Sequence, residues 1–321
     1  MPKSLAPYIW DMKKLHEHQP ALDTSKILRS VVMVDATIPE DSFTAPMLGT
    51  ERSGSGIVIS DKGLVLTVGY LIMEAESVTL TTSDGRTVEG HPMAFDPETG
   101  FGLVQALGTL DLPALSFGDS DKVAPGEQVY IAGVGEIVEA NLLAKQEFAG
   151  YWEYFLEEAL FTTPAHPAWG GAGLVGKDGR LLGIGSLQLQ AATSEGTQDI
   201  NMIVPINLLT PVLDDLLTHG KPNRPARPWL GLFSADHDGE VAVVNVDPRG
   251  PAAKAGIEPG DIIRDVRDQS VDSLADFYRE IWASGSAGTE ITLRIIRDGR
   301  EQWVRVRSAD RGDFLRKPML Q

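Results

Sequence analysis

The stretch that decides the fold reads GSGIVISDKGLVLT and covers residues 54–67. It holds two β-rich runs separated by the turn Asp61-Lys62-Gly63. Short apolar runs bounded by turn residues recur at residues 77–88, 128–132 and 181–185. Even spacing of short strands is typical of β-sandwiches and β-barrels, and the 33 glycines and 20 prolines supply the turns that such folds need.

The composition of the chain limits the classes of function that it can serve. Its 321 residues are enough for two domains, and 28 basic against 45 acidic residues give a net charge of −17. Because so acidic a chain repels phosphate groups, we expect neither nucleic acid nor an anionic membrane surface as a partner. The absence of cysteine excludes disulfide bonds, thiolate metal sites and a cysteine nucleophile.

The N-terminal sequence and the hydropathy of the chain bear on its location. Residues 4–10 form a short apolar run that Pro7 interrupts, which is not the pattern of a signal peptide. An uncharged stretch at residues 159–176 is broken by prolines and glycines and does not predict a membrane-spanning helix. We therefore expect no membrane span, and a cytoplasmic protein if Met1 is the natural start. A trimmed N-terminus would indicate the periplasm instead.

A helix and a stiff linker separate the strand-rich part from a second unit. Apolar residues recur at helical spacing between Pro205 and Gly220, and we expect the regular helix to begin nearer to Pro211. Residues 221–228 contain three prolines and predict an extended linker. In the unit that follows, a second helix begins at the capping residue Ser273.

Six short motifs follow one another in a fixed order along most of the chain. They are GSGIVIS (54–60), GDSD (118–121), DGRLLGI (178–184), MIVPINLL (202–209), WLGL (229–232) and PAAKAGIEPGD (251–261). In this order they resemble the HtrA family, trypsin-like serine proteases that carry a C-terminal PDZ domain. The resemblance implies a mainly β fold, a chymotrypsin-like double six-stranded β-barrel followed by an α+β PDZ domain.

Combined with the linker, the resemblance predicts five segments. They are an N-terminal arm (1–27), the double β-barrel with its C-terminal helix (28–220), the proline-rich linker (221–228), the PDZ domain (229–308) and a C-terminal tail (309–321).

The resemblance also identifies the positions at which the family carries its Ser-His-Asp triad. Tyr70 stands where the His follows the Leu-Thr step, Gly100 where the Asp follows an Asp-Pro-x-Thr step, and Gly170 where the Ser stands. A phenol with an ordinary pKa of about 10 is a poor base at neutral pH, and glycine can neither orient an imidazole nor attack a carbonyl. We therefore expect no catalytic residue at these three positions.

The loop that would carry the nucleophile reads HPAWGGAG, residues 166–173. Ala168 replaces the glycine whose N–H helps to form the oxyanion hole, and Trp169 places a large ring beside it. With Gly171, these residues predict a degenerate cleft. For His166 we expect hydrogen bonds to the backbone.

Other residues with reactive side chains do not rebuild a site in the sequence. Ser186 and Thr163 lie near the loop but have no evident base, and the pair Glu157-Glu158 is expected on a solvated helix or loop face. The His16-Glu17-His18 stretch indicates an ordinary tail rather than a metal site. Residues 171–178 match a phosphate-binding loop except for the final hydroxyl. We expect no metal and no cofactor.

The PDZ part retains what peptide binding requires. PDZ domains add an extended peptide to a sheet edge and capture its terminal carboxylate with backbone N–H groups. By position, the carboxylate loop falls on Leu230, Gly231 and Leu232, and the groove wall on Phe277, Tyr278 and Ile281. The alternative for these apolar residues is that they belong to the core.

The sequence thus predicts an HtrA-like pseudoprotease that binds peptides, protein C-termini or unfolded segments without cutting them, as a holdase, adaptor or regulator. The resemblance implies a homo-oligomer, with a trimer as one form. The alternative is an active serine endopeptidase with a rearranged site, and a third hypothesis is a purely structural subunit. A fluorophosphonate probe separates the first two, because it labels only an activated serine.

Overall fold

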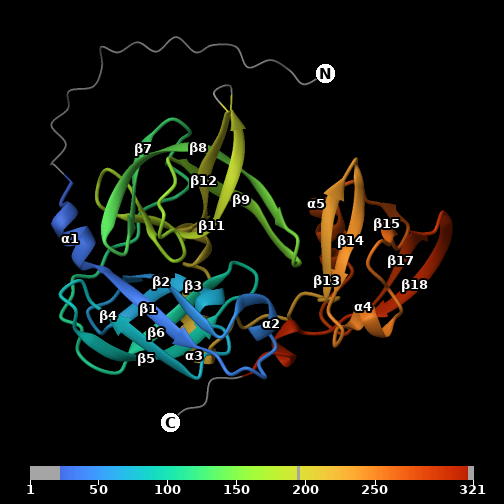
Figure 1. Ribbon diagram of the computed structural model, residues 1–321, viewed down its shortest axis with the longest axis horizontal. Helices are drawn as coiled ribbons and strands as arrows, with labels where there is room; N and C mark the ends of the chain where they lie inside the picture. Colours follow the sequence, from blue (N-terminus) through green and yellow to red (C-terminus); the bar gives the residue numbers. More distant parts are fainter. Residues whose placement is uncertain (1–21, 194–195, 317–321) are drawn as a thin grey trace.

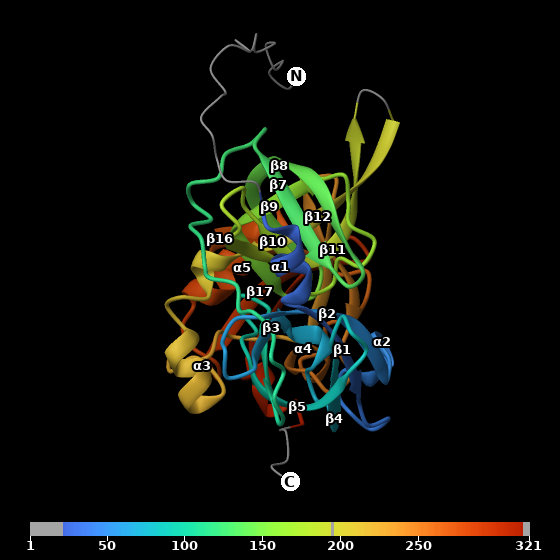
Figure 2. The same ribbon diagram turned by 90° about the vertical axis from the view of Figure 1, so that its left-hand side faces the viewer.

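The computed structural model describes residues 22–193 and 196–316. Two β-barrels are stacked on each other, and a third body, a sheet with its helices, stands beside them (Figures 1 and 2). Most of the predicted arm, including His16-Glu17-His18, lies outside the described residues. The arm's last residues begin helix α1 (Thr24–Arg29), which Asp23 caps and whose Ile27 is buried against the barrels.

The first barrel closes in the order β1-β2-β3-β6-β5-β4. Its strands are β1 (Val31–Thr37), β2 (Glu51–Val58), β3 (Leu64–Val68), β4 (Ser77–Thr81), β5 (Thr87–Phe95) and β6 (Phe101–Ala106). Alternate residues of these strands point inward, and Leu66, Leu80 and Leu103 are fully buried. The short helices α2 (Ala45–Leu48) and η1 (Gly69–Leu71) lie in its loops.

The second barrel closes in the order β10-β11-β12-β9-β8-β7. Its strands are β7 (Gln128–Gly133), β8 (Glu136–Gly150), β9 (Tyr154–Thr163), β10 (Gly173–Val175), β11 (Leu181–Thr193) and β12 (Gly196–Pro205). Ile131, Leu160 and Ile203 belong to its core. Strands β8 and β9 continue beyond the barrel as a hairpin whose end reaches strand β13 of the third body (Figure 1).

A short helical segment leads out of the barrels. The turn η2 (Ile206–Leu208) precedes helix α3 (Leu213–His219), so the regular helix begins after Pro211, as expected. Gly220 ends it in a left-handed conformation, with its N–H donated to the Leu216 carbonyl.

The third body is the PDZ domain. Its sheet runs β13-β14-β15-β17-β18, with β16 paired to β15 and β13 at the edge. The strands are β13 (Leu232–His237), β14 (Glu240–Val246), β15 (Ile262–Val266), β16 (Gln269–Ser270), β17 (Glu290–Arg297) and β18 (Arg300–Arg307). The helices are α4 (Pro251–Lys254), α5 (Leu274–Ala283) and the turn η3 (Arg311–Asp313). Ser273 caps α5 by accepting the Asp276 N–H at 3.1 Å, as predicted.

These bodies confirm the predicted fold class, a mainly β chain with two six-stranded barrels and an α+β PDZ domain. Within residues 22–193 and 196–316, every helix is too short or too polar to cross a membrane.

Candidate functional site

Tyr70 and Gly170 meet where the two barrels join. Helix η1, directly after β3, carries Tyr70, and the loop before β10 carries Gly170. A Cβ atom on Gly170 would stand 2.9 Å from the Tyr70 hydroxyl oxygen. That hydroxyl donates to the Ser186 carbonyl at 3.1 Å, and burial raises the pKa of Tyr70 above its ordinary 10. The phenol therefore stays protonated at neutral pH and acts as a hydrogen-bond donor, not as a base.

Gly100, the third triad position, lies beside η1 and offers no carboxylate. Its carbonyl accepts the Gly69 N–H at 2.7 Å, and its φ of +84° is a conformation that side chains rarely adopt. A Cβ here would lie 3.2 Å from the hydroxyl of Tyr154, which donates to the Thr99 carbonyl. The acid of this turn, Asp96, accepts the Thr99 hydroxyl at 2.7 Å.

The backbone N–H of Ala168 is directed at a side chain of its own loop. It donates to Nδ1 of His166 at 2.9 Å, and Nε2 of that ring lies 3.2 Å from the Glu136 carbonyl. Because Nδ1 accepts, Nε2 carries the proton, and burial lowers the pKa of His166 so that the ring stays neutral. Both ring nitrogens are thus bonded to backbone groups, as predicted. This use of the Ala168 N–H leaves it unable to point at a substrate oxyanion.

Trp169 and Gly171 are the other two residues that the sequence assigns to a degenerate cleft. The Trp169 ring lies 6.4 Å from that of Tyr70, tilted by 55°. Gly171 has a φ of +80°, and a Cβ on it would lie 1.9 Å from the Ser55 carbonyl oxygen. The loop is therefore closely packed on β2, and the rings of Trp169 and Tyr70 lie side by side next to it.

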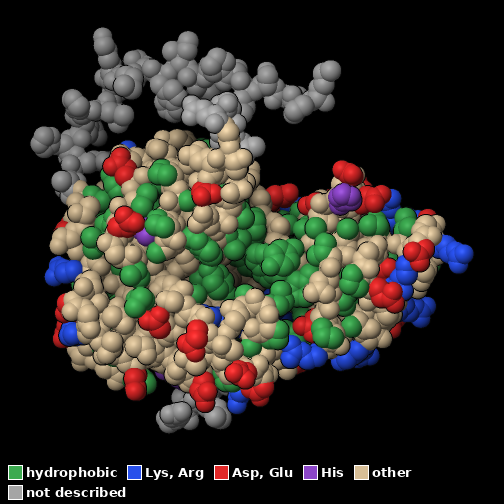
Figure 3. Space-filling model, viewed as in Figure 1, with side chains coloured by type: hydrophobic (Ala, Val, Ile, Leu, Met, Phe, Trp, Pro, Cys, Tyr) green, Lys and Arg blue, Asp and Glu red, His purple; other side chains and the backbone are tan. Residues whose placement is uncertain are grey.

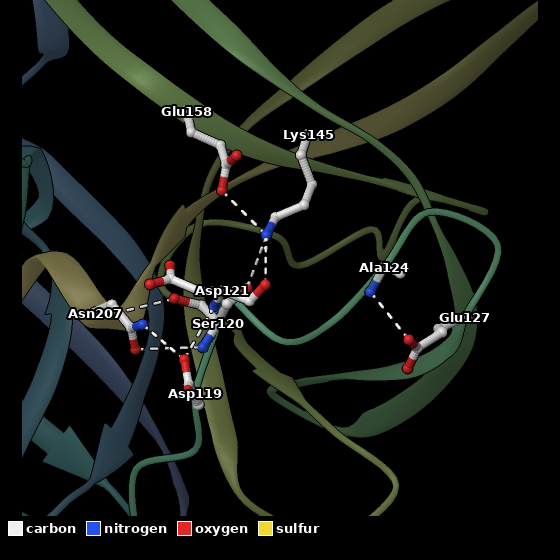
Figure 4. Close-up of polar contacts among 8 residues, drawn as sticks. All are labelled: Asp119, Ser120, Asp121, Ala124, Glu127, Lys145, Glu158 and Asn207. Carbon is white, nitrogen blue, oxygen red and sulfur yellow. Dashed lines mark hydrogen bonds and ion pairs between the residues drawn. The ribbon is translucent and has the colours of Figure 1, made fainter.

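The glutamate pair lies on a strand, which corrects the prediction of a helix or loop. Glu157 and Glu158 are exposed on β9, and Glu158 pairs with Lys145 at 3.1 Å (Figure 4). Glu157 pairs with Arg279 of α5 at 3.1 Å. Each carboxylate thus has a cationic partner.

Ser186 is 5% exposed, and its carbonyl accepts the Tyr70 hydroxyl.

No metal site is found in the part of the chain that the structure describes. It brings together no group of three His, Asp or Glu side chains able to hold an ion. The His16-Glu17-His18 stretch lies outside this part.

Arg52 holds the segment that carries Tyr70. Arg52 is 6% exposed, and its guanidinium donates to the carbonyls of Tyr70 at 2.7 Å and Met73 at 3.1 Å. We expect Arg52→Met to lower the free energy of unfolding by about 2 kcal/mol, because the carbonyls lose their buried donor. Thermal unfolding measures this. Arg180→Met, a change at a pair 60% exposed, should stay within about 0.5 kcal/mol of the wild type. Equal effects of the two variants would contradict this role of Arg52.

The predicted carboxylate loop of the PDZ domain does converge on a carboxylate. The N–H groups of Leu230, Gly231 and Leu232 all donate to the side chain of Glu153, at 2.7 to 3.2 Å. Gly231 allows this convergence because its φ is +80°. The side chains of Leu230 and Leu232 are buried in the PDZ core.

The three predicted groove residues of α5 are all buried. Phe277 and Ile281 belong to the PDZ core. Their side chains therefore follow the alternative hypothesis, that these apolar residues are core residues. Tyr278 also reaches out of the domain, since its hydroxyl donates to the Gly150 carbonyl at 2.7 Å. Glu153 could not be predicted from the sequence, because nothing marks it among 45 acidic residues.

A cavity of about 430 Å³ lies away from the degenerate cleft. Its wall includes Met93, Arg227, Trp229 and Arg311, and Glu153 borders it. Hydrophobic side chains gather in the hollow between the barrels and the PDZ domain on the face that Figure 3 shows.

Comparison with protein families gives two matches. The trypsin-like peptidase domain matches residues 54–184, and the PDZ domain matches residues 228–307. Both matches agree with the bodies described above.

Curated relatives are serine endoproteases by name. The chain is 27% identical over 266 residues to the periplasmic serine endoprotease DegP of Escherichia coli K12. It is 26% identical over 274 residues to a probable periplasmic serine endoprotease, DegP-like, of Halomonas elongata. These matches cover 77% and 80% of this chain but only 55% and 56% of the relatives.

Solved structures share the fold. The HtrA-type protease AlgW with a tripeptide matches with a TM-score of 0.53 and 21% identity, over 92% of this chain and 96% of that one. A serine endoprotease from Yersinia pestis matches with a TM-score of 0.53 and 24% identity, over 89% and 96%.

Proposed function

The chain is an HtrA-like protein, a trypsin-like peptidase domain followed by a PDZ domain, and on this premise we propose that it binds peptides without cleaving them. The observation that carries the proposal is the Tyr70 hydroxyl, hydrogen-bonded to a carbonyl and standing beside a glycine where the family's reaction needs an imidazole and a serine.

The chemistry of acyl transfer supports the proposal. It needs a nucleophile, a base within hydrogen-bond reach and donors aimed at the oxyanion. Position 170 has no hydroxyl, the Tyr70 phenol keeps its proton, and the Ala168 N–H is bonded to His166. Each of the three requirements is therefore unmet at the family's positions.

The ligand we propose is an extended peptide with a free C-terminal carboxylate. The convergent N–H groups of residues 230–232 suit a carboxylate, and the edge strand β13 suits an added strand. The similar protease AlgW has been solved with a tripeptide and with a decapeptide. Assembly into a homo-oligomer remains a prediction.

We place this function in the periplasm. The names of the relatives support that location and give no support to the cytoplasmic expectation.

The test of the proposal is proteolysis by the purified chain. We expect no cleavage of denatured casein within 24 hours and no labelling by a fluorophosphonate probe, because within residues 22–193 and 196–316 no serine hydroxyl is hydrogen-bonded to a histidine, and the Ser273 hydroxyl, which donates to Asp276, belongs to a helix cap. Ser186→Ala and Ser55→Ala serve as controls, since both residues lie at the junction of the barrels. Cleavage that one of these variants abolishes would refute the proposal in favour of the rearranged endopeptidase.

A further inference from the structure

The end of the β8–β9 hairpin lies in the groove where an external peptide would bind. One oxygen of Glu153 accepts the N–H groups of Gly231 at 2.7 Å and Leu232 at 2.8 Å, and the other accepts that of Leu230 at 3.0 Å. This is the geometry with which a backbone loop captures a terminal carboxylate. The side chain of a barrel residue thus occupies the loop.

The backbone of the turn at residues 150–153 also pairs with the PDZ domain, as a bound peptide would. The N–H of Ser234 in the edge strand β13 donates to the Tyr151 carbonyl at 2.9 Å. That carbonyl lies two residues before Glu153, and alternate residues of an added strand face the same way. Tyr151 also packs against Phe233, with ring centroids 6.2 Å apart. Carboxylate capture and strand pairing therefore act on one short segment.

Helix α5 holds the turn from the other side of the groove. The Tyr278 hydroxyl donates to the Gly150 carbonyl at 2.7 Å and accepts the Glu153 N–H at 3.2 Å. Phe155, the second residue of β9, is buried in the PDZ core and lies 6.2 Å from the Trp282 ring. The contact is thus built from both walls of the groove and is not a single ion pair.

The backbone conformation and the burial of Glu153 both suit its position in the loop. Its φ of +56° is unusual for a residue other than glycine, and the residue is only 7% exposed. The chain does not end here, so a side-chain carboxylate must serve where a peptide would offer its terminal one. Burying a carboxylate costs free energy, and the three N–H groups offset part of this cost.

We propose that the turn of residues 150–153 is an internal ligand of the PDZ groove, and that a peptide with a free C-terminus binds only by displacing it. The inference rests on the proposed function, since it concerns the same groove. Displacement releases a hairpin that belongs to the second barrel, so that peptide binding separates the PDZ domain from that barrel. An external peptide must therefore compete with the turn for the groove, and its apparent affinity is lowered accordingly.

The first measurement tests the contact between the turn and the PDZ loop in the absence of any peptide. Hydrogen exchange of the full chain is compared with Glu153→Ala, which removes the carboxylate, and with Tyr278→Phe, which removes the hydroxyl from the opposite wall. Glu158→Ala is the matched control, because Glu158 lies on the same strand and pairs only within the barrel. We expect the amides of residues 230–234 to exchange at least tenfold faster in the two test variants. Unchanged exchange in both would overturn the inference.

The second measurement tests whether the turn and an external peptide compete for the groove. The probe is a fluorescein-labelled peptide with the sequence of residues 145–152 and one added alanine, which supplies a free carboxylate two residues after the tyrosine. We expect Glu153→Ala and Tyr278→Phe to bind it at least tenfold more tightly than the wild type and Glu158→Ala, and the amide-ended peptide not to bind. Equal affinity of all four proteins would overturn the inference. If none of them binds, the proposed peptide binding fails, and exchange alone decides whether the turn occupies the groove.

Discussion

Gly171→Ala is expected to lower the free energy of unfolding of the two barrels by about 4 kcal/mol. The added Cβ would lie 1.9 Å from the Ser55 carbonyl oxygen and 2.5 Å from the Thr67 hydroxyl, and the first of these is backbone that cannot rotate away. The φ of +80° adds strain of about 1–2 kcal/mol for any residue with a side chain. Overpacking adds about 1–3 kcal/mol.

Two further glycines separate the causes of this loss. Gly179 has a φ of +75°, and a Cβ on it would make only an ordinary contact, 3.8 Å from Leu22 Cδ1, so Gly179→Ala measures the cost of the conformation without a clash. Gly170 has no such φ, and a Cβ there meets the Tyr70 hydroxyl at 2.9 Å, at the end of a side chain. We expect each control to cost about 1 kcal/mol in calorimetric unfolding. A Gly171→Ala loss no larger than that of Gly179→Ala would show that the loop adjusts to the methyl group.

The fold could be predicted from residues whose pattern is local. The run at residues 54–67 alternates strand and turn, and the helix at Ser273 begins with its own cap, so each fixes its structure without distant partners. The long hairpin of β8 and β9 was not predicted. Its far part leaves the barrel and packs on another domain, so its burial does not alternate with a period of two.

The two parts of the candidate site differ in the same way. Tyr70, Gly100 and Gly170 were identified because each follows a short motif in a fixed order, and the structure brings them to one junction. Glu153 lies 77 residues before Leu230, to which it bonds. That contact depends on how two domains meet, and no local pattern encodes the docking of a turn into a distant groove.

Glu153 also predicts how the stability of the protein depends on pH. Burial raises the pKa of its carboxyl from the ordinary 4.5 to about 7, although the three N–H donors and the Arg311 guanidinium oppose this rise. On the α5 side, the Tyr278 hydroxyl accepts the backbone N–H of Glu153 and not a bond from its carboxyl. Between pH 4.5 and 7 the folded protein therefore holds a proton that the unfolded chain has released. Raising the pH through this window must then destabilise the folded state.

We expect the loss to reach about 3 kcal/mol between pH 5 and pH 8, since each pH unit of the raised pKa is worth 1.36 kcal/mol. Glu153→Gln has the same shape but cannot titrate, so the difference between its stability and that of the wild type isolates this carboxyl from all others. The melting temperature of the wild type, measured relative to that of Glu153→Gln, should fall by about 5 °C as the pH rises to 8 and then stay constant. A difference that does not change with pH would mean that the donors of the loop keep Glu153 ionised throughout. The turn would then be held as a carboxylate at every pH, as a peptide terminus would be.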